Sequence, residues 1–226
     1  MSFTKTRPDQ TVARILIVDD HPAVREGLAL RIARQPDMEV CGEAADVAEA
    51  LQFVASARPD VAVIDIALKT GNGIDLIKRI KARNDAIRML VCSMYGETLY
   101  ADRALRAGAM GYITKEQATD KIIEAIRRVL AGKIYLSESM AEKLLHRTVG
   151  QGAAPLARSP MEKLSDRELE VFQLIGQGLD THQIAERMRV SPKTVETYRA
   201  RLKEKLGVTN RMELVQRAVQ WMVEQE

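Results

Sequence analysis

The chain has 226 residues, of which 46% are hydrophobic and 29% are charged, and its formal net charge is +3. These values are those of an ordinary globular protein with one large or two modest hydrophobic cores, and we expect two domains. Because Met1 to Thr11 lacks an apolar segment and no apolar run is long enough to cross a bilayer, we expect no secretory signal, no membrane partner and a cytoplasmic location.

Apolar segments alternate with amphipathic segments from the start of the chain to about residue 135. The apolar runs predict strands at 15–18, 39–44, 61–65, 88–93 and 111–114. The helical periodicity between them predicts helices at 22–34, 46–57, 74–82, 97–107 and 119–130. This alternation predicts an α/β fold with a doubly wound, five-stranded parallel sheet.

The pattern changes to purely helical in the last third of the chain. A linker with a short helix at 139–146 is expected first, because the Gly, Ala and Pro residues of 150–155 favour a flexible segment. A capping box, Ser165 to Glu168, then opens a helix that Gly178 ends. The expected divisions are a disordered tail at 1–13, an α/β domain at 14–135, a linker at 136–160 and a small all-α domain at 161–226.

Polar residues follow four of the predicted strands. Asp65 ends a strand that is apolar on both faces, and Asp19 and Asp20 follow the first strand. Ser93 closes the fourth strand, and Lys115 follows the fifth. Since the carboxyl ends of parallel strands meet at one edge of the sheet, we expect these side chains to share a crevice. Three crowded carboxylates would repel one another without a cation, so the pattern predicts a Mg²⁺ site.

The sequences Asp19-Asp20, Asp65, Ser93 and Gly111 to Lys115 resemble the receiver domain of two-component response regulators, over residues 14 to about 135. The resemblance implies a flavodoxin-like fold in which Asp65 accepts a phosphoryl group from a sensor histidine kinase. The resemblance further implies that Asp20, Asp65 and the Ala67 carbonyl bind Mg²⁺ directly and that Asp19 binds it through water. It also implies that Lys115 contacts the phosphate and that Ser93 and Tyr112 form a switch pair.

The loop after Asp65 departs from the pattern of the receiver family. Members commonly carry a Met-Pro pair there, whereas this chain reads Ile66-Ala67-Leu68-Lys69. The missing proline predicts a looser loop, and Lys69 adds a positive charge, so the rate of phosphorylation or the lifetime of the acyl phosphate is expected to differ from the usual one. This departure keeps open a phosphorylation-independent transcription factor with a degenerate receiver.

A basic helix is predicted near the carboxyl end of the chain. Ser191 is an N-cap, and Pro192 stands at the favoured first position of a helix that runs to Leu206. Helical spacing places Val195, Leu202 and Leu206 on the inner face, and a shorter helix at 181–188 precedes it. Between Arg187 and Arg211 eight residues are basic and two are acidic, which favours a polyanionic partner. The two helices form a predicted helix-turn-helix.

Residues 161–226 resemble the LuxR-type DNA-binding domain, above all in Leu164 to Val171 and in Val190 to Tyr198. Together the two resemblances indicate the NarL/FixJ group of response regulators, which implies double-stranded promoter DNA as a partner. The expected DNA contacts are Lys193, Thr194, Glu196, Thr197, Tyr198, Arg201 and Lys203. Members often have an asparagine and a basic residue where this chain has Asp180-Thr181-His182, a change that predicts the loss of a phosphate contact.

Glu196 is an acidic residue on an otherwise basic surface. One interpretation is that its carboxylate accepts a hydrogen bond from a cytosine amino group in the major groove, beside a contact of Thr197 with a thymine methyl group. The alternative is that it pairs with Arg199 or Lys203 along its own helix. The other predicted contact residues are better placed for the DNA backbone and groove edges.

The sequence as a whole predicts a transcription regulator and not an enzyme. Phosphorylation is expected to shift the protein towards a homodimer, and RNA polymerase is a further candidate partner. An aspartyl-phosphate hydrolase would need a second carboxylate at the position of Ala67. A flavin or nucleotide module would need a glycine-rich or hydroxyl-rich loop in place of Asp19-Asp20. Cys41 and Cys92 are isolated in apolar segments, which favours buried, reduced thiols.

Overall fold

The computed structural model describes residues 12–149 and 160–223. Most of the predicted tail, the central part of the predicted linker at 150–159 and the last three residues therefore lie outside the described residues. The chain divides into two compact units, and the boundary in the sequence falls between Ala141 and Glu142. Each unit is described by itself below.

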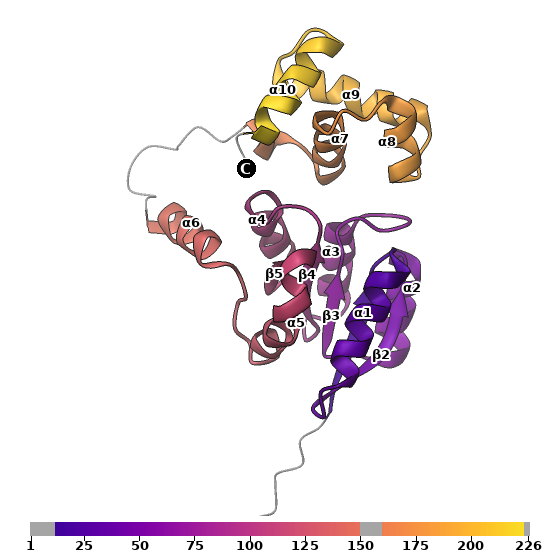
Figure 1. Cartoon of the computed structure of the whole chain (residues 1–226), viewed down its shortest axis with the longest axis vertical. Helices are drawn as coiled ribbons and strands as arrows, with labels where there is room; N and C mark the ends of the chain where they lie inside the picture. Colours follow the sequence, from indigo (N-terminus) through magenta and orange to yellow (C-terminus); the bar gives the residue numbers. More distant parts are fainter. Residues whose placement is uncertain (1–11, 150–159, 224–226) are drawn as a thin grey trace, which may run out of the picture. The chain divides into compact units, whose positions relative to one another are not determined.

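The N-terminal unit is an α/β sandwich around one sheet (Figure 1). Its strands are β1 Ala13–Val18, β2 Met38–Ala44, β3 Val61–Ile64, β4 Arg88–Ser93 and β5 Gly111–Thr114. Its helices are α1 Pro22–Ala33, α2 Val47–Ala57, α3 Gly73–Arg83, α4 Glu97–Ala107 and α5 Lys115–Leu130, and α6 Glu138–Val149 spans the division between the units. The strand order is β2-β1-β3-β4-β5, and each neighbouring pair is parallel. The predicted five-stranded, doubly wound sheet is confirmed.

Helix α5 begins at Lys115, four residues earlier than its periodicity predicts. Thr114 ends β5 and caps the helix, because its side chain accepts a hydrogen bond from the backbone N–H of Gln117. The strand therefore passes directly into the helix. As a consequence Lys115 lies on the first turn of α5, at the edge of the sheet.

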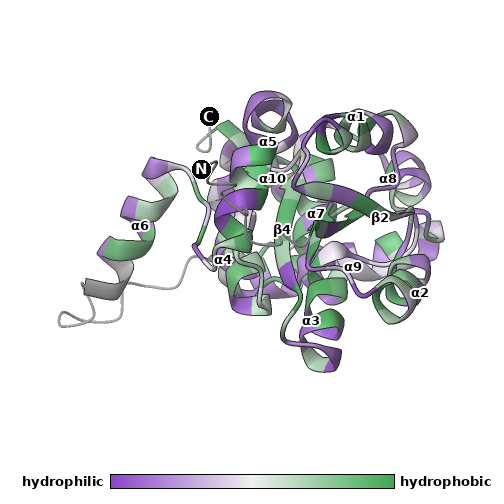
Figure 2. Cartoon of the chain, turned by 90° about the horizontal axis from the view of Figure 1, so that it is seen from below, coloured by the Kyte–Doolittle hydropathy of each residue, from purple (hydrophilic) through white to green (hydrophobic). Residues whose placement is uncertain are grey.

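Alternate residues of the central strands point to opposite faces of the sheet and are buried on both. One face packs against α1 and α5, which contact each other, and α3 contacts α2 and α4. The core between the sheet and the α1/α5 layer includes Ile15, Ile17, Val61, Val63, Leu90, Cys92, Ile113, Ile122 and Ile126. In Figure 2 strand β4 is hydrophobic, whereas α3 and α5 carry hydrophilic residues on part of their surface.

The C-terminal unit is helical throughout its described length. It contains a short 3-10 helix η2 Pro160–Lys163, then α7 Asp166–Gly176, α8 Thr181–Met188, α9 Pro192–Leu206 and α10 Arg211–Val223. Its core includes Leu169, Phe172, Ile175, Ile184, Val195, Leu202, Leu214 and Ala218, and the ring of Phe172 packs against that of Trp221. The predicted small all-α fold is confirmed.

Helix α9 has the inner face predicted for it, with one correction. Val195, Leu202 and Leu206 are buried as expected. Arg199 is also buried, with 5% of its surface exposed, although it is one of the eight basic residues between Arg187 and Arg211. The reason is geometric, because residue 199 falls between 195 and 202 on the same helical stripe. Burial lowers the pKa of Arg199, and its Nε has no hydrogen-bond partner among the described residues.

The cysteines follow the expected pattern in part. Both are free thiols; Cys92 is buried and Cys41 is half-buried. Burial raises the pKa of Cys92 to about 12, so this thiol stays protonated and unreactive at neutral pH. Among the described residues no helix combines the length and the apolar composition that a bilayer crossing requires.

The predicted capping box at the start of α7 is formed. The Ser165 hydroxyl accepts from the Glu168 N–H at 3.3 Å, and the Glu168 carboxylate accepts from the Ser165 N–H at 2.7 Å. The same carboxylate accepts from Lys205 Nζ at 2.6 Å. Burial alone would raise the pKa of Glu168, but the bonds from Lys205 and Ser165 outweigh it, so that pKa is lowered.

We expect Glu168→Gln to keep the cap and lose the charge pair with Lys205. The free energy of unfolding should fall by about 1 kcal/mol at pH 7, because Lys205 is partly exposed and solvent screens the pair. A lowered pKa stabilises the fold above the ordinary value of 4.5 and stops doing so as the pH falls through the folded value. The difference from the parent should therefore shrink below about pH 4.5 in urea titrations followed by the fluorescence of Trp221; a constant difference would contradict this account.

Candidate functional site

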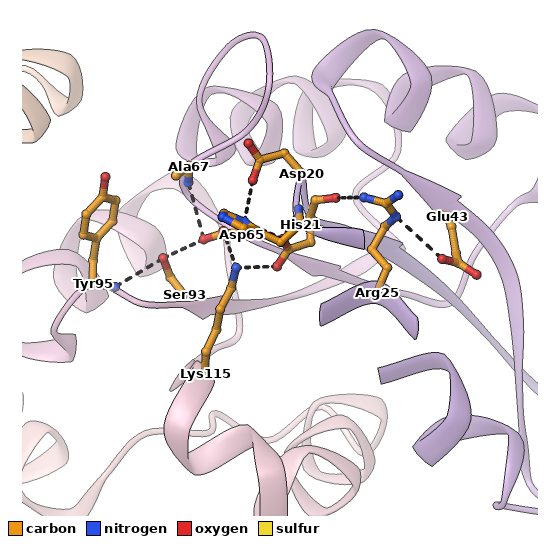
Figure 3. A network of polar contacts seen from close by, with 10 residues as sticks. Asp20, His21, Arg25, Glu43, Asp65, Ala67, Ser93, Tyr95 and Lys115 are labelled. Carbon is orange, nitrogen blue, oxygen red and sulfur yellow. Dashed lines mark hydrogen bonds and ion pairs between the residues drawn. The ribbon is translucent and has the colours of Figure 1, made fainter. Parts of the chain in front are cut away.

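The carboxyl ends of four adjacent strands bring the predicted acidic site together (Figure 3). Asp19 and Asp20 follow β1, Asp65 follows β3, Ser93 ends β4 and Lys115 follows β5. The Asp65 N–H donates to the Val18 carbonyl at 2.8 Å, so sheet pairing continues up to the carboxylate itself. Asp19, Asp65 and Ser93 are almost completely buried.

The two carboxylate oxygens of Asp65 have different partners. Oδ1 accepts from the Ser93 hydroxyl at 2.6 Å and from the Ala67 N–H at 3.4 Å. Oδ2 accepts from Lys115 Nζ at 2.7 Å. A hydroxyl donates to one oxygen of Asp65 and an ammonium group donates to the other. Together they fix the orientation of the carboxylate at the edge of the sheet.

Lys115 also reaches a second carboxylate, since its Nζ lies 2.6 Å from Asp19 Oδ2. Burial lowers the pKa of Lys115, but Asp65 and Asp19 together outweigh this effect, so the pKa is raised and the ammonium form is favoured. Burial raises the pKa of Asp65, while Lys115 opposes that shift. The ion pair is therefore what permits a charged carboxylate in this buried position.

Asp65 belongs to a group of side chains that could bind a metal ion. One potential ligand atom from each of Asp19, Asp20, His21 and Asp65 lies within 4.8 Å of the others, so the group can hold a metal ion. His21 Nδ1 is 2.8 Å from Asp20 Oδ1. His21 was not among the predicted site residues, although its position directly after the acidic pair was the available signal.

Arg25 is a second residue that the sequence analysis missed. Its Nη1 donates to the Asp19 carbonyl at 2.6 Å, and its Nε lies 3.6 Å from Glu43 Oε2 (Figure 3). The guanidinium thus joins the loop after β1 to the neighbouring strand β2. Arg25, one turn into α1, thus holds the backbone that carries Asp19 and Asp20.

The loop after Asp65 is held by several contacts although it lacks the proline that members of the receiver family commonly carry. Ile66 and Leu68 are buried, and Ala67 forms an isolated bridge with Asn72. The Gly73 N–H donates to the Ile66 carbonyl at 2.8 Å, and a Cβ at position 73 would lie 2.1 Å from the Asp65 carbonyl oxygen. Glycine is required at this close approach. These contacts hold the loop in place, and a looser loop than in members with the proline stays a prediction. Lys69 is exposed.

Ser93 and Tyr112 lie on one path of hydrogen bonds. The Ser93 hydroxyl that contacts Asp65 accepts from the Tyr95 N–H at 3.5 Å, and the Tyr112 hydroxyl donates to the Tyr95 carbonyl at 2.7 Å. The Tyr112 ring is buried, with 1% of its surface exposed. Tyr95 therefore connects the carboxylate site with the aromatic residue of β5.

The second candidate site is the outer face of α9. The predicted contact residues are all at least partly exposed there, namely Lys193, Thr194, Glu196, Thr197, Tyr198, Arg201 and Lys203. Glu196 Oε1 accepts from the Thr181 hydroxyl of α8 at 2.8 Å. Within residues 160–223 no ion pair within 4 Å joins Glu196 to Arg199 or Lys203, although the charge of Glu196 opposes the lowering of the Arg199 pKa.

Comparison with known protein families matches both units. A family described as the response regulator receiver domain matches residues 15–127. A family described as bacterial regulatory proteins of the luxR family matches residues 162–218. Together these matches include both candidate sites.

Individual proteins are similar over nearly the whole chain. The DNA-binding transcriptional activator DevR/DosR of Mycobacterium tuberculosis is 38% identical over 88% of this chain and 91% of its own. The oxygen regulatory protein NreC of Staphylococcus carnosus is 36% identical over 91% of this chain and 96% of its own. RcsB of Salmonella enterica serovar Typhimurium, solved on promoter rprA with a phosphomimetic beryllium fluoride, is 25% identical, with a TM-score of 0.59 over 90% of this chain and 96% of that one.

We expect Lys115→Met to destabilise the N-terminal unit by about 3 kcal/mol or more at pH 7, because it leaves Asp19 and Asp65 buried without their counter-charge. Urea denaturation followed by circular dichroism would measure the loss. Adding Asp19→Asn should restore part of it, since one of the two carboxylates is then neutral.

Lys121→Met is the matched control, because it removes the same charge from an exposed position of the same helix. It should change the free energy of unfolding by less than about 0.5 kcal/mol. Equal effects of the two substitutions would contradict a stabilising role for the Lys115 pair.

Proposed function

The chain belongs to the response regulators that join a receiver domain to a LuxR-type DNA-binding domain, and we propose that phosphorylation of Asp65 controls its binding to promoter DNA. It is a transcription regulator and not an enzyme. The observation that carries the proposal is the set of contacts to Asp65, whose two oxygens bind Ser93 and Lys115 at the edge of the sheet.

The phosphoryl donor is proposed to be a phosphohistidine of a sensor histidine kinase. An oxygen of Asp65 attacks the phosphorus, an O–P bond forms, and the P–N bond to the donor histidine breaks, with a proton taken up by the released imidazole. Lys115 neutralises charge on the phosphoryl oxygens, and Ser93 donates to one of them. Both groups already lie within 2.7 Å of the attacking carboxylate.

Mg²⁺ is the proposed metal, held by Asp20, Asp65 and the carbonyl of Ala67, with Asp19 beside them. The donor set fits, because three of the four clustered residues offer carboxylate oxygens, which this hard cation prefers. When bound, the ion would offset the negative charge that accumulates on the transferring phosphoryl group.

Phosphorylation is proposed to favour a homodimer on paired half-sites. It adds about −1.5 to −2 charges beside Lys115 and Ser93, and Ser93 is linked to Tyr112 through Tyr95. To convert a population almost entirely inactive into one almost entirely active, the two states must differ in interaction by roughly 5.5 kcal/mol. Promoter DNA as the ligand supports a cytoplasmic location, and RNA polymerase is a further proposed partner.

Phosphorylation-independent DNA binding is the second candidate. The altered loop at Ile66 to Lys69 favours it, but the hydrogen bonds that hold this loop and the complete set of Asp65 partners argue for a working receiver. A hydrolase is disfavoured because Ala67 offers no carboxylate. A comparison of DNA binding with and without phosphorylation separates the phosphorylation-controlled candidate from the phosphorylation-independent one.

Asp65 is expected to be the phosphorylated residue. With a small-molecule phosphodonor and Mg²⁺, borohydride trapping and mass spectrometry should place the modification on Asp65, because its partners neutralise the incoming charge. Asp65→Asn should abolish the label. Asp20→Ala should abolish the Mg²⁺-dependent labelling of Asp65 while the circular dichroism spectrum stays unchanged.

Sedimentation of the same samples would test the output. The phosphorylated protein should contain a larger dimer fraction and bind operator DNA more tightly than the Asp65→Asn protein. Equal sedimentation and equal affinity in both states would favour the phosphorylation-independent candidate.

The DNA-reading role is proposed for the outer face of α9. Glu196 would accept from a cytosine amino group, and Thr197 would contact a thymine methyl group. Lys193, Thr194, Tyr198, Arg201 and Lys203 are proposed to bind the backbone and groove edges. Support comes from the exposure of this face and from the absence of an ion pair that would hold Glu196 along its own helix within residues 160–223.

We expect Glu196→Ala to lose about 1–3 kcal/mol of discrimination at one C·G pair in each half-site, because a base contact carries sequence information. Arg201→Ala should instead weaken all sequences alike and reduce the salt dependence by about one released counterion. Binding-site selection and salt titrations would measure the two effects. An identical consensus for the parent and Glu196→Ala would exclude base reading by this residue.

A further inference from the structure

Glu196 has a contact that its own helix does not provide. It lies on the second turn of α9 with an exposed side chain, and a glutamate in such a position ordinarily samples several rotamers. Here Oε1 accepts a hydrogen bond of 2.8 Å from the hydroxyl of Thr181, the first residue of α8. The position of the carboxylate is therefore set by the neighbouring helix.

Thr181 is itself a rigidly placed donor. Its χ1 angle is restricted because threonine is β-branched. The preceding residue, Asp180, caps α8 by accepting from the His182 N–H at 2.8 Å and the Gln183 N–H at 2.9 Å. Gln183 reaches back to the Asp180 N–H at 2.9 Å and completes a capping box. The first turn of α8, which carries Thr181, is thus held by three hydrogen bonds.

The packing of the two helices fixes their mutual position. Ile184, Ala185 and Met188 of α8 are buried, as is Val195 of α9, and the two helices contact each other. The turn between them is closed by the Val190 N–H, which donates to the Ala185 carbonyl at 2.9 Å. The Thr181–Glu196 bond therefore joins two elements that the hydrophobic core already holds together.

The contact leaves Glu196 able to bind a further donor. A carboxylate offers about four lone-pair positions on two oxygens, and the hydroxyl of Thr181 occupies one of them on Oε1. Arg199, three residues further along α9, is buried and forms no ion pair with Glu196 among the described residues. Among the described residues Oε2 accepts no hydrogen bond, so it can accept one from a donor outside the protein.

We propose that Thr181 positions Glu196 for base reading, so that sequence discrimination depends on a residue of α8 that contacts no base itself. The inference rests on the proposed DNA-reading role of Glu196. A fixed carboxylate loses less rotamer freedom on binding and meets a cytosine amino group in one geometry, whereas a mobile one tolerates other bases.

The test compares two substitutions of Thr181 in the full-length phosphorylated protein. Thr181→Val removes the hydroxyl with little change of shape, and Thr181→Ser keeps it. Fluorescence anisotropy would measure affinity for the selected operator, for the operator with its critical C·G pair replaced by T·A, and for unrelated DNA. Thr181→Val should lower the ratio of the first two affinities by about five- to tenfold, and Thr181→Ser should retain it.

Thr209→Val is the matched control. The Thr209 hydroxyl also donates to a glutamate, Glu213 Oε2 at 3.0 Å, but that pair lies at the start of α10 and outside α9. This variant loses the same kind of bond and should keep the parental base preference. Circular dichroism and Trp221 fluorescence would establish that each variant is folded.

Three results would overturn the inference. A parental discrimination ratio in Thr181→Val would show that Glu196 needs no positioning from α8. An equal loss of affinity for operator and unrelated DNA would assign Thr181 a purely structural role. An unchanged consensus in Glu196→Ala would remove base reading and this inference together, whereas a changed consensus with an unaffected Thr181→Val would remove only the role of Thr181.

Discussion

The buried ion pair of Lys115 with Asp65 and Asp19 is the constraint on which the N-terminal unit depends. Two carboxylates lie almost completely out of water, 2.6–2.7 Å from one ammonium group. Removing the ammonium group leaves two buried carboxylates uncompensated, so the folded state and the reactive carboxylate are maintained by the same contacts. The parallel sheet makes this possible because it delivers four strand ends to one edge.

Hydrogen bonds extend this constraint away from the acidic site. Ser93 contacts Asp65 and accepts from Tyr95, whose carbonyl accepts from Tyr112. A change in the charge of Asp65 therefore acts on a connected set of buried and half-buried groups and not on one exposed side chain. The loop after Asp65 belongs to the same arrangement, because backbone hydrogen bonds and the close approach of Gly73 hold it without the proline that its family commonly uses.

The C-terminal unit places its polar groups by a different physical means. Its helices begin at side-chain caps, Ser165 for α7, Asp180 for α8 and Ser191 for α9. Each cap fixes the first turn of its helix. Thr181 lies on the first turn of α8, and the polar face of α9 begins on the first turn of α9. Asp180-Thr181-His182, which departs from the family pattern, thus supplies both a cap for α8 and a donor to Glu196.

The sequence by itself determined the strands, the capping box at Ser165, the inner face of α9 and the carboxyl-end position of Asp65, because these follow from periodicity and local hydrogen bonding over a few residues. Only the tertiary structure decided that Arg199 is buried, that His21 and Arg25 join the acidic group, and that Thr181 holds Glu196. These features depend on which helix packs on which and at what angle. That packing is the sum of many contacts between distant residues, and no short pattern in the sequence encodes it.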